Sequence, residues 1–291
     1  MKKNYVVMTD SSADLNPALE QELGVDIIPL SVKCGDRTFL DYPDEREIKT
    51  SEFYGMLRSG ANAKTAAANV ETFLTAMSRH LEQGKDVLYL GFSSGLSSTY
   101  SASEIAAQEL RERYPERKVL TVDTLCASMG QGLLVWLTVQ ELKHGATLEE
   151  AAKYAEDNRL HLCHWFTVDD LFFLKRGGRV SAATALVGSA LGIKPVLHVD
   201  NEGHLINVSK ARGRKNSILA LADRMERSAI EPEKQTVFIS HGDCEEDAKY
   251  LAGLVKERFG YDECLINIIG PTIGAHAGPG TLALFFLGDV R

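Results

Sequence analysis

The chain has 291 residues, which is long enough for two domains, or one large one, with an ample core. It is 44% hydrophobic and 25% charged, as is usual for a globular protein, and its net charge of −8 argues against nonspecific nucleic-acid binding. Because no apolar run is long enough for a membrane span or a signal peptide, we expect a cytoplasmic protein with transient or no membrane contact.

The first half of the chain alternates predicted strands with predicted helices. This alternation, at these lengths, indicates a parallel sheet with helices on both faces. Strands are predicted at residues 5–9, 26–32, 86–92 and 118–122. Helices are predicted at residues 17–23, 51–58, 70–82, 99–114, 129–142 and 148–158.

Polar turns follow several of these strands. In open α/β sheets, ligands bind beyond the carboxyl ends of the strands. We therefore expect three polar turns to converge on one crevice, and these are Asp10-Ser11, Ser93-Ser94 and Asp123-Thr124.

The second half has a different character. Residues 194–200 and 204–210 form a predicted hairpin around the turn 201–203, and a long amphipathic helix follows through residue 227. Residues 182–192, AATALVGSALG, form a predicted helix of small residues, and an apolar segment, LALFFLG, lies near the end of the chain. Ordinary core packing and the wall of an apolar tunnel both explain these two segments. Further strands are predicted at 236–240 and 264–269, and a helix at 245–259.

We expect two α/β domains with a boundary near residue 160. Residues 1–160 carry the parallel sheet, and residues 161–291 form the second domain.

The segment GFSSG at residues 91–95 matches the Gly-x-Ser-x-Gly nucleophile elbow. A strand, a small-residue turn and a helix equally suit an anion cradle of free backbone N–H groups and serine hydroxyls. Plain helix capping by Ser97 or Ser98 is a third explanation, with no ligand at all. The turn alone supports all three.

His276 lies in GAHAGPG, where glycines let a ligand approach closely. A catalytic triad could combine Ser93 with Asp123 or Asp243 and with His276, while His241 competes for any histidine role. A carboxylate-binding site needs the same residue types, so composition does not separate the two hypotheses.

The cysteines and the HLCH segment do not favour a metal or disulfide framework. The five cysteines are scattered, odd in number and free of any CxxC pair, which suits reduced thiols. On a strand, His161 and Cys163 share a face while His164 points away, leaving two ligands. We expect no metal site.

Two basic runs contain Arg176, Arg179, Arg212 and Arg214. Guanidinium groups on glycine-rich loops suit phosphate or carboxylate docking, and a solvated face is the alternative.

Seven motifs follow one another along the chain. They are TDSSADL, SSGLSSTYSA, VDT with ASMGQGLLV, VDDL with LKRGGRVS, KPVL, RGRK and IGPTIGAHAGPG. In this order they resemble the DegV family of bacterial fatty-acid-binding proteins, of the FakB type. The resemblance runs from Thr9 to Gly288 and implies a two-domain α/β protein with one long-chain fatty acid in a tunnel between the domains.

The resemblance implies a carrier rather than an enzyme, with the fatty acid as ligand and no cofactor. Such carriers present the carboxylate to a separate ATP-dependent, DAK-type fatty acid kinase, which makes acyl phosphate for phospholipid synthesis. It also implies that Arg176, Arg179, Arg212 and Arg214 face the kinase or the phosphate. The implied carboxylate-binding residues are Thr65, His276 and Ser93 or Ser94, of which we favour Ser94 because it lies nearer the helix.

The chain departs from the family pattern at residues 65–69. Where the family commonly has TSQPS, this chain has TAAAN, so Thr65 remains while its neighbours change.

Two other functions fit the same residues: a serine acyl hydrolase using Ser93 and His276, and a phosphosugar-binding protein. For a fatty acid, burial of about sixteen carbons at about 0.8 kcal/mol each gives on the order of 10 kcal/mol before ordering costs. A hydrogen bond contributes only about 1 kcal/mol. An apolar tunnel would therefore set the affinity, and the polar residues would set the orientation.

Overall fold

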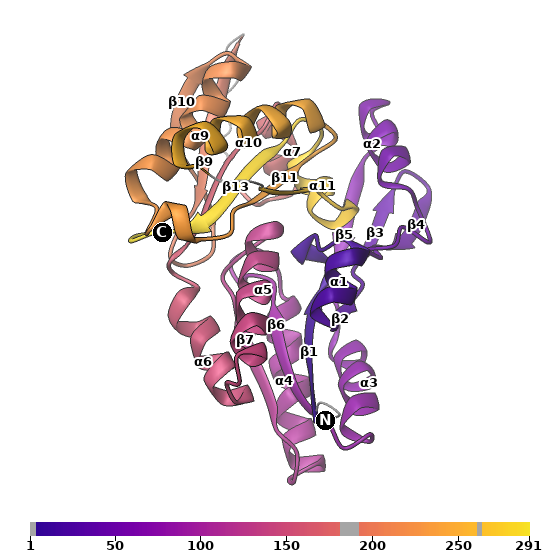
Figure 1. Cartoon of the computed structure of the whole chain (residues 1–291). Coiled ribbons are helices and arrows are strands. Elements are labelled where there is room, and N and C mark those ends of the chain that lie inside the picture. The colour runs from indigo at the N-terminus through magenta and orange to yellow at the C-terminus, as the bar shows by residue number, and fades with distance from the viewer. Residues whose placement is uncertain (1–3, 181–191, 261–263) are drawn as a thin grey trace.

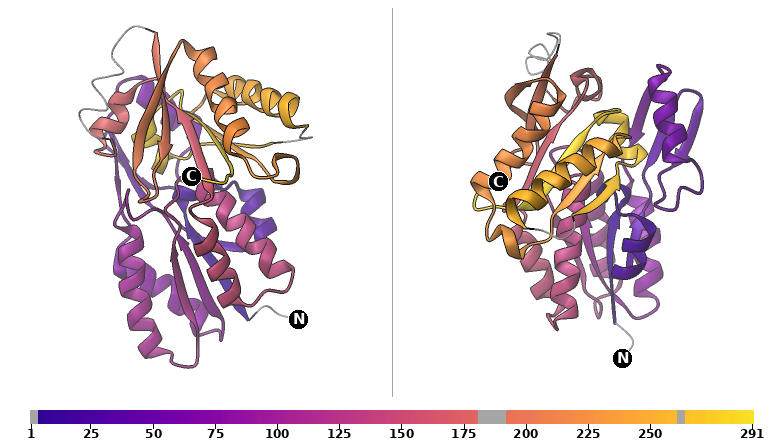
Figure 2. Two further views of the ribbon diagram at one scale, coloured as in Figure 1. Left: turned by 90° about the vertical axis from the view of Figure 1, so that its left-hand side faces the viewer. Right: turned by 45° about the horizontal axis from the view of Figure 1, so that its top comes forward.

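The computed structural model describes residues 4–180, 192–260 and 264–291 (Figure 1). The predicted small-residue helix at 182–192 lies outside the described residues except for Gly192. Two sheets with their helices occupy opposite ends of the molecule, and a third, small sheet lies beside the second (Figures 1 and 2). None of the helices in the described ranges is long and apolar enough to cross a bilayer.

The first sheet is parallel, as the alternation of strands and helices predicted. Side chains alternate along its strands, so Val7 packs with the cluster of α1, α5 and α6, while Val6 and Met8 pack with α3 and α4. Helices therefore cover both faces. The strand order is β2 (Val25–Ile28), β1 (Tyr5–Asp10), β6 (Asp86–Gly91) and β7 (Val119–Asp123). The helices are α1 (Pro17–Leu23), α3 (Val70–Leu81), α4 (Thr99–Arg113), α5 (Met129–Lys143) and α6 (Leu148–Asn158).

The second sheet is mixed and has six strands. Helices α9 (Arg214–Ser228) and α10 (Glu245–Phe259) cover one face, and α5 packs against the other, joining the two layers. The predicted hairpin is confirmed as the antiparallel pair β9 and β10. The strand order is β10 (Leu205–Arg212), β9 (Ile193–Val199), β8 (Leu162–Thr167), β13 (Leu282–Leu287), β11 (Phe238–His241) and β12 (Leu265–Ile268).

The third sheet, β4 (Arg37–Leu40), β3 (Ser31–Cys34) and β5 (Ala63–Ala66), is antiparallel and packs against α2 (Thr50–Arg58). Its existence corrects the single strand predicted at 26–32. The chain leaves the first sheet after Ile28, at Pro29, and re-enters a different sheet at Ser31. Proline has no N–H for a sheet ladder, which suits this break.

Four further elements complete the described chain. They are the short helices α7 (Leu171–Arg176) and α11 (Pro271–Ala277) and the 3-10 turns η1 (Ser11–Ala13) and η2 (Pro232–Lys234). The apolar segment LALFFLG near the end of the chain forms β13, which lies inside the second sheet between β8 and β11.

Candidate ligand-binding site

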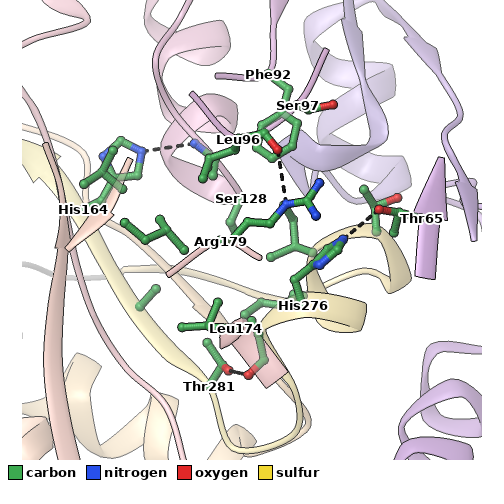
Figure 3. A pocket seen from close by; sticks show the side chains of 18 of the residues that line it. Thr65, Phe92, Leu96, Ser97, Ser128, His164, Leu174, Arg179, His276 and Thr281 are labelled. Carbon is green, nitrogen blue, oxygen red and sulfur yellow. Dashed lines mark hydrogen bonds between the residues drawn. The ribbon is translucent and has the colours of Figure 1, made fainter. Parts of the chain in front are cut away.

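A cavity of about 230 Å³ lies between the Ser-rich turn, the third sheet and the second sheet (Figure 3). Most of the side chains that line it are apolar, and they come from segments far apart in the sequence. A mostly apolar cavity with a few polar groups is typical of small-molecule binding sites. The apolar lining includes Phe92, Leu96, Phe166, Leu174, Val199, Leu205, Ala283 and Phe285.

Thr65 and His276 form a polar contact at one side of the cavity, opposite His164 (Figure 3). Thr65 Oγ1 lies 2.7 Å from His276 Nε2, although the residues are 211 positions apart. The contact forms because α11 packs against β5. The structure therefore brings together two of the residues that the resemblance singled out.

His276 lies in the last turn of α11, not in a glycine-rich loop as its sequence context suggested. Pro271 begins the helix and Gly278, with φ of +79°, ends it. Proline suits the first helical position because its missing N–H would be unpaired there, and glycine accepts a positive φ after the last turn. This short helix fixes the imidazole against Thr65.

The electrostatic surroundings of His276 favour a neutral imidazole. Burial lowers its pKa to about 4, and the positive charges of Arg179 and Arg176 act in the same direction. The Nδ1 atom of His276 is buried and has no hydrogen-bond partner among the described residues. An anionic group bound here would oppose both effects.

The segment Arg176-Gly177-Gly178-Arg179 forms the wall beside His276. Arg179 lines the cavity and donates from Nε to Leu96 O at 3.2 Å (Figure 3). Arg176 stacks on Phe173 at 4.9 Å, and its buried Nη2 has no partner among the described residues. A Cβ atom on Gly177 would lie 2.3 Å from His276 Nδ1, so only glycine leaves room for the imidazole.

Arg212 and Arg214 have other surroundings. Arg214 Nε donates to Asp247 Oδ2 at 2.8 Å, and its Nη1 lies 3.6 Å from Asp169. Arg212 is exposed, and neither arginine is among the described residues that line the cavity. The two basic runs therefore do not share the cavity.

Ser93 and Ser94 of the Ser-rich turn are not among the described residues that line the cavity. Ser93 is fully buried and donates to Gly203 O at 2.9 Å, at the tip of the β9–β10 hairpin. Ser94 is exposed, and its backbone N–H donates to Asp123 Oδ1 at 3.2 Å. Of the described serines in this turn, Ser97 and Ser98 line the cavity, so our preference for Ser94 finds no support in the geometry.

The polar turns at the ends of β1, β6 and β7 do meet, but they bond to one another. Asp10 Oδ2 accepts from Tyr89 Oη at 2.6 Å and from Phe92 N at 3.1 Å. Thr124 Oγ1 donates to Gly91 O at 2.6 Å. These bonds fix the turn that carries the cavity-lining serines.

The hydrogen bonds of a catalytic triad are not formed among the described residues. Ser93 donates to a backbone carbonyl, His276 contacts Thr65, and Asp243 pairs with Arg58. His241 Nδ1 accepts from Cys244 N at 3.2 Å, in the turn that follows β11. A nucleophilic serine has no base beside it in this arrangement.

The polar side chains of the HLCH segment, residues 161–164, form hydrogen bonds with backbone groups. His161 Nδ1 contacts Gly288 O at 3.0 Å, Cys163 donates to Val290 O at 3.3 Å, and His164 Nδ1 contacts Leu162 O at 3.0 Å. In the described ranges, no group of three or more His, Cys, Asp or Glu residues is placed to hold a metal ion.

Three further hydroxyls line the cavity, although the sequence alone assigned none of them to a site. Ser128, Ser240 and Thr272 come from the start of α5, from β11 and from α11. The Ser128 hydroxyl contacts the buried carboxylate of Asp14. Their common location results from the packing of α5 and α11 between the layers, which no local pattern reveals.

The structure defines an α/β protein with a parallel sheet, a mixed sheet and a largely apolar cavity, and comparison with known proteins gives its family. The chain matches the DegV family, described as uncharacterised proteins, over residues 4–289. A DegV domain-containing protein of Clostridium perfringens is 43% identical over 289 residues, 99% of both chains. One from Streptococcus pyogenes is 34% identical over 285 residues, 98% of both chains. The chain belongs to the DegV family.

Two solved structures share this fold over nearly their whole length. A DegV lipid-binding protein from Thermotoga maritima superposes with a TM-score of 0.87, at 30% identity and 99% coverage of both chains. A DegV family protein from Thermus thermophilus, described by its fatty acid binding, gives a TM-score of 0.86 at 31% identity. That match covers 98% of this chain and 99% of the other.

Proposed function

We propose that this protein binds a long-chain fatty acid in the cavity, with the carboxylate beside Thr65 and His276. The observation that carries the proposal is the buried Nδ1 of His276, which has no partner among the described residues and lies at the polar side of a largely apolar cavity. The lipid-binding and fatty-acid-binding structures of two relatives that share the fold support the same ligand class.

The head group is held by neutral donors and by a nearby positive charge. When Thr65 donates to Nε2, the single proton of the neutral imidazole lies on Nδ1 and can be donated to a carboxylate oxygen. The Arg179 guanidinium at the same wall attracts the negative charge. Ser97 and Ser98 supply the hydroxyls of the Ser-rich turn, while Ser93 ties the turn to the hairpin.

The acyl chain provides most of the affinity. Burial of about sixteen carbons contributes on the order of 10 kcal/mol before ordering costs, against about 1 kcal/mol for each neutral hydrogen bond. The altered TAAAN segment contributes to this surface, because Ala66 and Ala67 line the cavity. In this proposal the two domains, residues 1–160 and 161–291, enclose the ligand between them.

The carboxylate is then presented to a separate ATP-dependent, DAK-type fatty acid kinase. The kinase transfers the γ-phosphoryl group of ATP to a carboxylate oxygen, giving ADP and an acyl phosphate for phospholipid synthesis. The protein itself is a cytoplasmic carrier in this scheme. Arg176 and Arg179 lie close enough to His276 to influence its charge, so they would face the carboxylate, and the exposed Arg212 would belong to the surface on which the kinase docks.

The ligand class is tested by calorimetric titration with hexadecanoic acid and with hexadecanol. The two ligands have an alkyl chain of the same length, and only the acid carries a carboxylate. We expect the acid to bind about tenfold more tightly or better, because a charged hydrogen bond contributes about 1.5–3 kcal/mol. Equal affinities, or no binding of either, would contradict the proposal.

Two further assays test the role of the bound acid. A fatty acid kinase incubated with ATP should form acyl hydroxamate, after hydroxylamine trapping, only when this protein supplies the fatty acid. A serine-directed fluorophosphonate should leave Ser93 unlabelled, because no base lies beside it. Stoichiometric labelling of Ser93 would instead support an acyl hydrolase.

A further inference from the structure

Part of the cavity wall beyond the Thr65 and His276 contact is polar. The side chains of Ser128, Ser240 and Thr272 line it, with exposed fractions of 5%, 0% and 3%. A saturated hydrocarbon chain offers these hydroxyls no hydrogen bond, so any bonding capacity that they have left stays unused beside an alkyl chain.

Two of these hydroxyls have unused bonding capacity. A hydroxyl donates one hydrogen bond and accepts two. Ser240 Oγ contacts Ser128 Oγ at 2.9 Å, and Thr272 Oγ1 contacts Ser11 Oγ at 3.1 Å. Among the described residues, Ser240 Oγ has no second partner. The Thr272 hydroxyl also bonds to the carboxylate of Asp41, which leaves it one acceptor position. Ser128 contacts both Asp14 and Ser240.

The chain of contacts from Asp14 determines what Ser240 can offer to a ligand. When Asp14 is ionised, Ser128 donates to it, Ser240 donates to Ser128, and Ser240 can only accept from the cavity. Burial raises the pKa of Asp14 well above its usual range. When Asp14 is protonated the directions reverse, and Ser240 donates into the cavity. A ligand hydroxyl satisfies Ser240 in both cases, whereas a keto group does so only in the second.

The position of Thr272 indicates where along a ligand such a group would lie. Thr272 precedes His276 by four residues on α11, so the two side chains share a helix face. Four residues correspond to a separation of about 6 Å along the helix axis. The second polar point is therefore several carbons away from the carboxylate rather than beside it.

We propose that Ser240 and Thr272 form a second recognition point in the cavity, and that the preferred ligands are long-chain fatty acids carrying a hydroxyl group along the chain. This inference rests on the proposed function and names its substrate class more narrowly. The carboxylate binds at Thr65 and His276, and the hydroxyl oxygen along the acyl chain determines which fatty acid binds most tightly.

The test is competitive displacement of a fluorescent fatty acid by octadecanoic acid and by its hydroxy isomers, with the hydroxyl placed from carbon 3 to carbon 12. We expect at least one isomer to bind about fivefold more tightly than octadecanoic acid, as one additional hydrogen bond allows. Ser240→Ala or Thr272→Val should bring that ratio close to one. Ser103→Ala, which removes a buried hydroxyl outside the cavity lining, should leave the ratio unchanged.

The outcomes separate this inference from the proposed function. If octadecanoic acid binds and no hydroxy isomer binds more tightly, the inference is overturned and the proposed function stands. A preference that survives both substitutions also overturns it. If no fatty acid binds, both are overturned. Thermal melting confirms folding of each variant, and Ser240→Cys, whose thiol is a weak donor, replaces Ser240→Ala if the latter fails to fold.

Discussion

The Ser-rich turn and the end of α11 both place buried polar groups near the cavity, yet they differ in how much of their bonding capacity is used. Ser93 donates to Gly203 O and accepts from Gly95 N, and Asp10 accepts several bonds from the same region. At the end of α11, His276 Nδ1 is buried without a partner among the described residues, and so is the neighbouring Arg176 Nη2.

We take this difference to separate a structural region from the proposed ligand site. Groups that hydrogen-bond to each other stabilise the fold and have little hydrogen-bonding capacity left for a ligand. A buried group without a partner carries a free-energy cost of about 1–3 kcal/mol that a ligand can relieve. The serine motif that first suggests chemistry is therefore mostly structural, and we place the recognition of the carboxylate at α11.

The largest effect is expected from His276→Ala. It removes the proposed carboxylate donor, so the affinity for hexadecanoic acid should fall about 10- to 100-fold, as loss of a charged hydrogen bond implies. Titration of both proteins measures the change. His204→Ala is the matched control, because His204 is an exposed histidine at the hairpin. If the affinity of His276→Ala for hexadecanoic acid changed by less than twofold, α11 would not be part of the carboxylate site.

Gly177→Ala tests the same site without touching a polar group. The added Cβ would lie 2.3 Å from His276 Nδ1, so the imidazole must move and the affinity should fall about tenfold. Gly253→Ala in α10 adds a methyl group in open space and should leave binding unchanged. Unaltered affinity in Gly177→Ala would show that the position of the imidazole does not matter.

The titration of His276 gives a pH dependence with a defined sign. Its pKa of about 4 in the folded protein lies below the usual 6.5, so the folded state favours the neutral ring. The resulting stability is present above pH 6.5 and is lost as the pH falls through about 4. NMR of the labelled imidazole should show this pKa in the free protein and a higher one with bound fatty acid. An identical pKa in both states would place the carboxylate elsewhere.

The smallest effects should distinguish two serines of one turn. Ser97→Ala removes a cavity-lining hydroxyl and should weaken binding about fivefold, with little change in stability. Ser93→Ala should lower the free energy of unfolding by about 1 kcal/mol and leave binding within about twofold, because Ser93 bonds to the hairpin. Chemical denaturation and titration of both variants make the comparison. If Ser93→Ala weakened binding and Ser97→Ala did not, the carboxylate would bind at Ser93 instead.

The regular elements of the fold were predictable because their signals are local. Apolar spacing gave the helices and buried strands of the first sheet, and the Asn201-Glu202-Gly203 turn gave the hairpin. The break after Ile28 was missed, because Pro29 lies between two apolar strands that belong to different sheets. Helix α11 was missed because it is short and is bounded by Gly270 and Gly278, which gives the segment the composition of a loop.

The site was only partly predictable, because its contacts are long-range. Motif resemblance pointed to Thr65 and His276, but their 2.7 Å contact depends on the packing of α11 against β5. Ser97, Ser98 and Thr272 lie within motifs that carried the resemblance, but the sequence assigned none of them to the ligand site. Ser240 gave no signal, since an isolated hydroxyl on a strand is indistinguishable from any other core residue.

Native mass spectrometry tests the central claim most directly. The protein is incubated with a mixture of long-chain fatty acids, and the mass of the complex is recorded before and after denaturation. We predict one intact fatty acid per chain, released on denaturation and largely lost in His276→Ala. An absence of bound fatty acid, or an acyl group that stays attached to Ser93 after denaturation, would contradict the account.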